Sequence, residues 1–145
     1  MPLPIDISKE ALENMIRDLE EAYPDEGCGF LFGTDGETRK ITEARKVINS
    51  KEGDKRRRFE VKPTDYMKAE MYAEENNLQL VGIYHSHPNH PSRPSETDLK
   101  QAFPVFSYII ISVNEGKAGN ITSWQLNEEG KFEQEKIINE NINNN

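Results

Sequence analysis

The run LQLVGIYHSH, residues 78–87, is the feature that most restricts how this chain can fold. Its apolar and β-branched residues predict a buried internal strand, and two histidines stand at its end. Closely spaced prolines follow and hold the next segment out of regular structure. A short helix is then expected to begin near Ser95 and to end before Pro104. The order is therefore strand, rigid loop, helix.

The rest of the chain alternates between helical and extended patterns. Ser8 is expected to cap a helix that Pro24 stops. A second helix is predicted over 64–76, with Met67, Met71 and Ala73 on one side. The extended segments are a hairpin over 27–48, a short strand over 59–61, and strands over 107–113, 121–127 and 131–138, with an exposed loop over 49–58. This alternation predicts an α/β fold with a mixed central sheet flanked by helices.

Length, net charge and cysteine content limit the kinds of protein to which this chain can belong. The length of 145 residues fits one domain, placed at residues 1–138, and the polar segment 139–145 is expected to be disordered. A net charge of −8 argues against a surface for nucleic acid. No apolar run approaches the ~20 residues of a membrane helix, and the N-terminus lacks the pattern of a signal peptide. The single cysteine excludes an internal disulfide. We therefore expect a cytoplasmic protein that binds neither nucleic acid nor membranes.

The histidines carry the clearest chemical signal. His85 and His87 share one face of the predicted strand, because side chains two residues apart in a strand point the same way. The proline-rich loop can bring Asp98, at the start of the next helix, back over the strand end. Two imidazoles, one carboxylate and an open position make a hydrolytic zinc site. Taken separately, exposed histidines and a helix capping box from Ser95 to Asp98 explain the same residues.

A family resemblance joins these residues. The run His85-Ser86-His87-Pro88, followed by Ser95-x-x-Asp98, resembles the signature of the JAMM (MPN+) metalloproteases. Glu26, just before Gly27-Cys28-Gly29, resembles the segment in which that family places a catalytic glutamate. Nearly the whole chain, apart from its end, is similar to the small bacterial single-domain branch. The resemblance implies a cytidine-deaminase-like α/β sandwich.

The resemblance also implies roles for residues. His85, His87 and Asp98 match the zinc ligands, and a zinc-bound water attacks the amide or isopeptide bond. Glu26 matches the general base that takes the proton from that water and later passes it to the leaving amine. Ser95 matches the residue that stabilises the oxyanion. Enzymes of the small branch act on ubiquitin-like sulfur-carrier proteins and release cysteine or a peptide from the C-terminal Gly-Gly. The protein itself is expected to be a monomer or a homodimer.

Other interpretations stay open at this point. The same ligands fit a non-haem iron enzyme, and some members of the fold family are non-catalytic scaffolds. A branch related to RadC carries an Asn where this chain has Ser86. Cys28 is expected to be a buried strand residue rather than a nucleophile, and His90 to be exposed. The basic run Lys55–Arg58 is expected to be a solvated loop, and we hypothesise that it helps to bind an acidic or extended partner.

Overall fold

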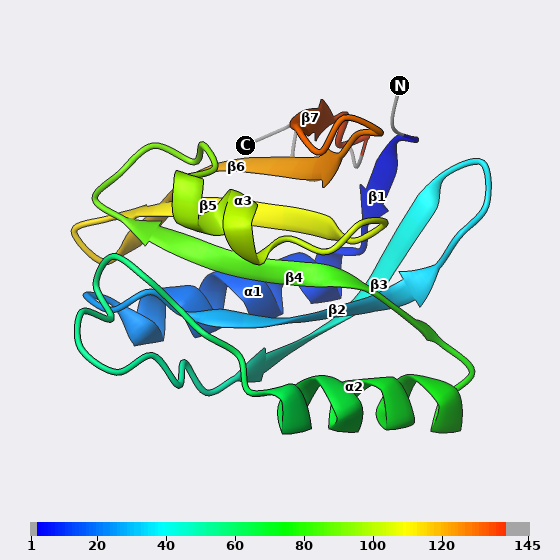
Figure 1. Ribbon diagram of the computed structural model, residues 1–145, viewed down its shortest axis with the longest axis horizontal. Helices are drawn as coiled ribbons and strands as arrows, with labels where there is room; N and C mark the ends of the chain where they lie inside the picture. Colours follow the sequence, from blue (N-terminus) through cyan, green and yellow to red (C-terminus); the bar gives the residue numbers. More distant parts are fainter. Residues whose placement is uncertain (1–2, 139–145) are drawn as a thin grey trace.

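The computed structural model describes residues 3–138 and builds them around one mixed sheet (Figure 1). Within that range the sheet order is β1-β3-β2-β4-β5-β6-β7. The pairs β1/β3 and β4/β5 are parallel and the other neighbours are antiparallel. The strands are β1 (Ile5–Ile7), β2 (Cys28–Thr34), β3 (Arg39–Val47), β4 (Gln79–Pro88), β5 (Ser107–Asn114), β6 (Lys117–Leu126) and β7 (Phe132–Glu135), and the helices are α1 (Lys9–Ala22), α2 (Pro63–Glu75) and α3 (Glu96–Gln101). The predicted α/β class with a mixed central sheet is confirmed.

Helix α1 forms as its sequence predicts. The Ser8 side chain accepts a hydrogen bond from the backbone N–H of Ala11 at 3.1 Å and so caps the helix. Four residues on one stripe are buried, and the helix ends at Ala22, two residues before Pro24. The buried stripe packs against the sheet face that carries Leu31 and Tyr84. This layer of side chains is one half of the hydrophobic core.

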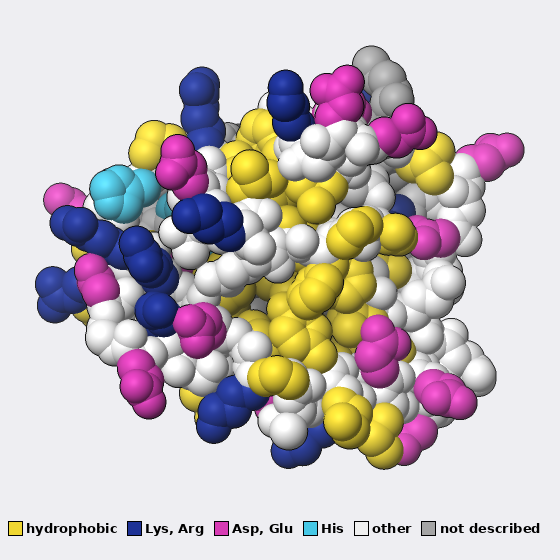
Figure 2. Space-filling view, in the orientation of Figure 1, with side chains coloured by type: hydrophobic (Ala, Val, Ile, Leu, Met, Phe, Trp, Pro, Cys, Tyr) yellow, Lys and Arg dark blue, Asp and Glu magenta, His cyan; other side chains and the backbone are white. Residues whose placement is uncertain are grey.

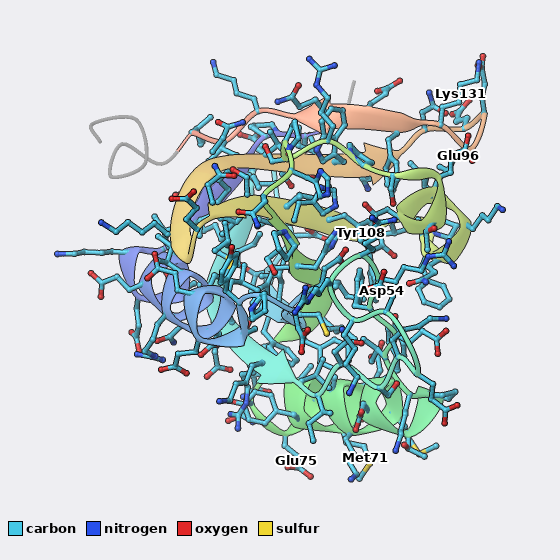
Figure 3. All side chains as sticks on the ribbon, turned by 90° about the vertical axis from the view of Figure 1, so that its left-hand side faces the viewer. Asp54, Met71, Glu75, Glu96, Tyr108 and Lys131 are labelled. Atoms are coloured by element: carbon cyan, nitrogen blue, oxygen red, sulfur yellow. The ribbon has the colours of Figure 1, made fainter. Side chains whose placement is uncertain are left out.

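Helix α2 covers part of the opposite sheet face, where Phe30 and Ile83 lie. The predicted helix is present, but its predicted apolar side is wrong in part. Met67 and Met71 are 62% and 54% exposed, and Ala73 is buried with Ala69 instead. In Figure 3 the labelled Met71 points away from the sheet. Small residues face the sheet because they let the helix backbone approach it closely.

Two other expectations can be compared with the structure, which also contains a strand that was not predicted. Strand β1 was not predicted: it is a short edge strand paired in parallel with β3. The strand predicted over 59–61 is absent from the sheet, because the backbone of Glu60 bonds instead to Asn49 and Ser50 in the preceding loop. Cys28 is buried in β2 as expected, and burial raises the pKa of its thiol to about 12. The segment 139–145 lies outside the described residues.

The connection from β4 to β5 positions the site. Because these strands are parallel, the chain must leave the end of β4, cross over the sheet and return before β5. That crossover contains the proline-rich loop and α3. It therefore brings the start of α3 close to the end of β4 (Figure 1). None of the described helices is long and apolar enough to cross a membrane.

Candidate metal centre

His85 and His87 lie side by side near the end of β4. Their ring centroids are 5.1 Å apart, and both side chains are buried, at 1% and 7% exposed. The ring of Phe59 stacks on that of His85 with 4.6 Å between centroids. Ser86, between them, points to the other face of the sheet. The shared face predicted for the two histidines is therefore present.

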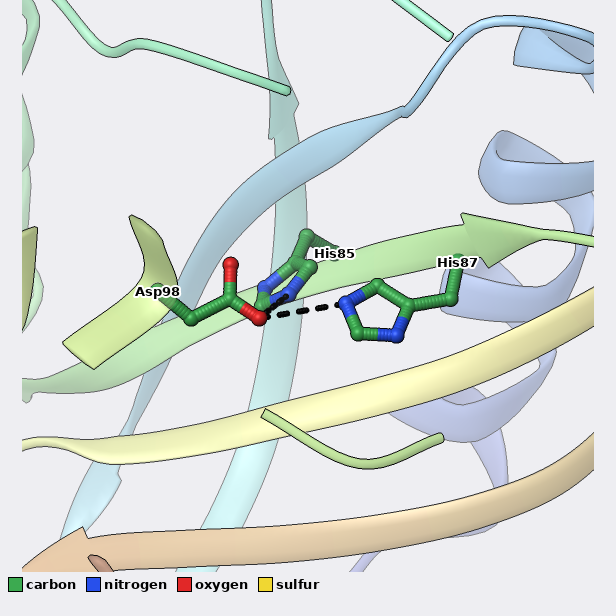
Figure 4. Close-up of side chains that lie close together, drawn as sticks. All are labelled: His85, His87 and Asp98. Carbon is green, nitrogen blue, oxygen red and sulfur yellow. Dashed lines mark hydrogen bonds and ion pairs between the residues drawn. The ribbon is translucent and has the colours of Figure 1, made fainter. Parts of the chain in front are cut away.

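Asp98 meets both histidines from the first turn of α3 (Figure 4). Its Oδ2 atom lies 3.1 Å from Nε2 of His87 and 3.3 Å from Nε2 of His85. The same oxygen accepts a hydrogen bond from the backbone N–H of Ser95 at 2.9 Å, and the Ser95 Oγ accepts one from Asp98 N at 3.0 Å. The capping box is thus present together with the histidine cluster. The Oδ2 atom of Asp98 takes part both in the capping box and in the cluster with the two histidines.

The donor set fits a divalent cation. His87 Nδ1 lies 2.8 Å from the carbonyl oxygen of Pro91, which can only accept, so Nδ1 carries the proton. In the neutral ring this leaves the lone pair of Nε2 directed toward the Asp98 carboxylate. Among the described residues, neither ring nitrogen of His85 has a hydrogen-bond partner. A cation shared by the two Nε2 atoms and the carboxylate would satisfy all three groups.

The electrostatics agree with this arrangement. Burial opposes the ionisation of Asp98, but His85, His87 and the Ser95 N–H outweigh it and hold the pKa of Asp98 well below its usual range. Burial likewise opposes protonation of His87, whereas Asp98 and the Pro91 carbonyl favour it, and its pKa is raised overall. Both directions show that the structure favours positive charge beside the Asp98 carboxylate.

Glu26 lies at the same end of the sheet, two residues before β2 begins. It is 5% exposed, and its Oε1 atom has no hydrogen-bond partner in the described part of the chain. Burial raises the pKa of Glu26 to about 8, with Asp98 and Asp54 adding to the effect and His87 opposing it. Its backbone N–H donates to the carbonyl of Lys55, which ties the 49–58 loop to the site. A carboxyl buried without a partner beside a cation site is typical of a proton-transfer group.

Ser95 and Glu26 line one cavity. Its volume is about 540 Å³, and its walls also include His87, His90 and Arg93. Since the Ser95 Oγ accepts the Asp98 N–H, its own hydroxyl proton is free to be donated to a group in the cavity. The structure thus places Glu26, Ser95, His85, His87 and Asp98 at one end of the sheet. His90 is exposed, as expected.

Three residues important to this geometry were not predicted from the sequence to belong to the site. Pro91 supplies the carbonyl that fixes the His87 tautomer, Phe59 covers His85, and Asn49 donates through Nδ2 to the carbonyls of Glu26 and Arg58. The buried position of Phe59 follows from its aromatic side chain in an otherwise charged segment. The Asn49 and Pro91 contacts depend on loop conformation, and no sequence pattern signals them.

Comparison with known proteins shows the family of the chain. The family described as prokaryotic homologues of the JAB domain (Prok-JAB) matches residues 8–127, and the chain belongs to this family. The resemblance to the small prokaryotic JAMM/MPN branch is confirmed.

The chain is similar to a desampylase from Pyrococcus furiosus, with 38% identity over 115 residues that cover 78% of this chain and 75% of the relative. It is also similar to a probable TtuB-protein conjugate cleaving protease from Thermus thermophilus, with 38% identity over 52 residues that cover 36% and 35% of the two chains. Among solved structures, protein DSY2949 from Desulfitobacterium hafniense superposes with a TM-score of 0.80 at 31% identity, covering 92% of this chain and 91% of that one.

Proposed function

We propose that this protein is a zinc-dependent hydrolase that cleaves an amide or isopeptide bond after the C-terminal Gly-Gly of a ubiquitin-like sulfur-carrier protein. The observation that carries the proposal is the approach of His85 and His87 to a single oxygen of Asp98, at 3.3 and 3.1 Å. The relatives named desampylase and TtuB-protein conjugate cleaving protease support the reaction class and the ubiquitin-like substrate.

His85, His87 and Asp98 would hold the metal through Nε2, Nε2 and a carboxylate oxygen. When bound, zinc supplies a Lewis acid and lowers the pKa of water to about 7. The Pro91 carbonyl and the Ser95 N–H keep His87 and Asp98 oriented for this role. The carboxylate thereby stays fixed by the backbone whether or not it binds a cation.

Glu26 moves the proton in this proposal. Its unpartnered Oε1 takes a proton from the attacking water and delivers it to the departing amine. A nearby divalent cation lowers the pKa of a buried carboxyl, so the metal would bring Glu26 into its ionised form at neutral pH. Ser95 donates its hydroxyl proton to the carbonyl oxygen as negative charge develops there.

The proposal also includes several broader expectations. The mixed sheet with a helix on each face is consistent with a cytidine-deaminase-like sandwich, formed by residues 1–138 as one domain. We also keep the expectations of a cytoplasmic protein and of a monomer or homodimer. Neither nucleic acid nor a membrane is a proposed partner.

To test the proposal, the chain is incubated with a carrier extended by cysteine or a short peptide after its terminal Gly-Gly. The intact mass of the carrier is then measured. We expect the zinc-loaded chain to remove the extension, and we expect no mass change with a chelator or with Glu26→Ala. Activity restored by iron but not by zinc would contradict the zinc assignment. Stoichiometric zinc binding without cleavage of any extended or conjugated carrier would contradict the proposed reaction and favour a scaffold.

A further inference from the structure

Positive charge gathers around the cavity that contains Glu26 and Ser95, although the whole chain has a net charge of −8. Two arginines, Arg57 and Arg93, line this cavity and have no part in the proposed reaction. Figure 2 shows several Lys and Arg side chains close to an exposed histidine at this end of the molecule. A local basic rim on an acidic protein points to an anionic ligand.

Neighbouring acidic side chains compensate little of the charge of these two arginines. Arg93 forms no ion pair with any residue between 3 and 138. Arg57 lies 3.7 Å from a carboxylate oxygen of Asp54, but both side chains are mostly exposed, at 79% and 56%. An ion pair so exposed is weak and can yield to a better-placed anion.

The loop that carries Arg93 is fixed by its neighbour. Ser92 is 2% exposed, and its Oγ accepts a hydrogen bond from Asn120 at 2.8 Å, while its carbonyl accepts one from Thr122. Strand β6 therefore anchors the backbone one residue before Arg93. Arg57 comes from a different loop, which is tied to Glu26 through Lys55. The two arginines thus reach one cavity from two separate loops.

We propose that Arg57 and Arg93 bind a free carboxylate on the leaving group of the substrate. The inference rests on the proposed hydrolysis of a carrier extended after Gly-Gly, and it assigns two residues that would recognise the extension. Guanidinium groups bind carboxylates strongly and with defined geometry. A Gly-Gly tail has no charge of its own, and a lysine side chain in an isopeptide bond has no carboxylate close to the scissile bond. A cavity of about 540 Å³ is within the range of small-ligand sites, which suits a short leaving segment.

The reaction balances without a further reactant. The bond between the glycine carbonyl carbon and the leaving nitrogen breaks, and a bond from that carbon to a water oxygen forms. The proton from water passes to the leaving nitrogen. The products are the carrier with a C-terminal glycine carboxylate and a free amino acid or peptide, whose own carboxylate the arginines hold.

A substrate pair tests the inference directly. A ubiquitin-like carrier ending in Gly-Gly-Ala is prepared by peptide ligation with either a free carboxylate or a C-terminal amide, and kcat/KM is measured for each with the zinc-loaded chain. We expect wild type to prefer the acid by about tenfold, equivalent to about 1.4 kcal/mol. The double variant Arg57→Ala/Arg93→Ala should lose this preference by slowing only on the acid. Arg58→Ala, in the same loop but outside the cavity, should behave as wild type.

The outcomes separate this inference from the proposed function. Equal rates on acid and amide by wild type would overturn the carboxylate subsite while leaving the hydrolase in place. An equal loss on both substrates in the double variant would also overturn it, because the arginines would then bind the body of the carrier. Cleavage of neither substrate by wild type would instead contradict the proposed function.

A binding measurement tests the carboxylate subsite without relying on catalytic turnover. Fluorescence anisotropy gives the affinity of a labelled peptide ending in Gly-Gly-Ala for the Glu26→Ala chain, as acid and as amide. We expect tighter binding of the acid, and we expect that difference to vanish when Arg57→Ala and Arg93→Ala are added. Unchanged discrimination in the triple variant would overturn the subsite.

Discussion

The hydroxyl of Ser86 accepts a hydrogen bond from the backbone N–H of Gly27 at 2.9 Å, across the pair of strands β4 and β2. Ser86 is fully buried, and its own N–H donates to the carbonyl of Gly27 at 3.1 Å. The residue between the two histidines therefore holds the residue that follows Glu26. These two hydrogen bonds join the backbone beside the proposed base to the backbone between the two histidines.

Ser86→Ala should lower kcat while zinc affinity stays unchanged. The substitution removes the acceptor of the Gly27 N–H, which frees the backbone beside Glu26 and costs about 1–3 kcal/mol of unfolding free energy. Urea unfolding, zinc titration and kcat measure the three quantities separately. Ser112→Ala is the matched control, because Ser112 is also buried but its hydroxyl donates to the Asn120 carbonyl. A loss of stability with full kcat would assign Ser86 a purely structural role.

Zinc should stabilise the folded chain, because an ion that binds only the folded state shifts the unfolding equilibrium. At a free concentration one hundred times Kd the gain is about 2.7 kcal/mol, or a rise in Tm of roughly 5–10 °C for a chain of this length. Thermal unfolding with zinc and with a chelator measures this difference. We expect His87→Ala to remove it and His90→Ala to keep it. An equal rise in the His87→Ala variant would contradict the ligand assignment.

Glu135 should make stability depend on pH. It is 3% exposed, and burial raises its pKa, although hydrogen bonds from Ser123 and Ser107 and the charge of Arg39 oppose that effect. The neutral form is therefore favoured in the folded state. Its contribution to stability is complete below the ordinary glutamate pKa and is lost as pH rises through the raised value.

Glu135→Gln keeps the shape of the side chain and cannot ionise. Urea unfolding from pH 4 to pH 8 should show the stability of wild type falling relative to this variant as pH increases. Glu133→Gln, on the same strand but only partly buried, is the control and should follow wild type. A constant difference between wild type and Glu135→Gln across this range would contradict the prediction.

Gly82→Ala should destabilise the sheet where β4 begins to pair with β5. A Cβ at this position would collide with the backbone carbonyl oxygen of Ser107, which cannot move without breaking the strand pairing. We expect a loss of about 1–3 kcal/mol, as for other overpacked sites. Gly36→Ala is the control, since the nearest atom to its added Cβ is 3.8 Å away. Equal unfolding free energies for the two variants would contradict this account.

The sequence predicts the parts of the fold that depend on local patterns. Alternation along a strand placed His85 and His87 on one face, and side-chain capping placed the starts of α1 and α3. The three-residue strand β1 has no such pattern, because it depends on pairing with β3, more than thirty residues away. The predicted apolar side of α2 is wrong in part because hydrophobicity alone favours Met67 and Met71, whereas close packing on the sheet favours the small Ala69 and Ala73.

The candidate site was also predictable only in part. The spacing of His85, His87 and Asp98 predicts a ligand set, but the sequence alone does not separate the two interpretations of Asp98, as helix cap and as ligand. The structure shows that one oxygen of Asp98 both accepts the cap hydrogen bond from Ser95 and faces the two histidines. The arginines at the cavity come from two loops that the sequence places 36 residues apart, at Arg57 and Arg93. That both arginines line one cavity depends on how those loops fold over the sheet.

Apart from His87 on β4, the residues that line this cavity belong to the segments that connect or begin elements rather than to the sheet. The 49–58 loop joins β3 to α2, and the proline-rich loop joins β4 to α3. Insertions and deletions in such loops disturb the strand pairing very little. Duplicated genes can therefore diverge in the substrates they accept by lengthening or recharging these two loops, while the histidines on β4 stay where they are.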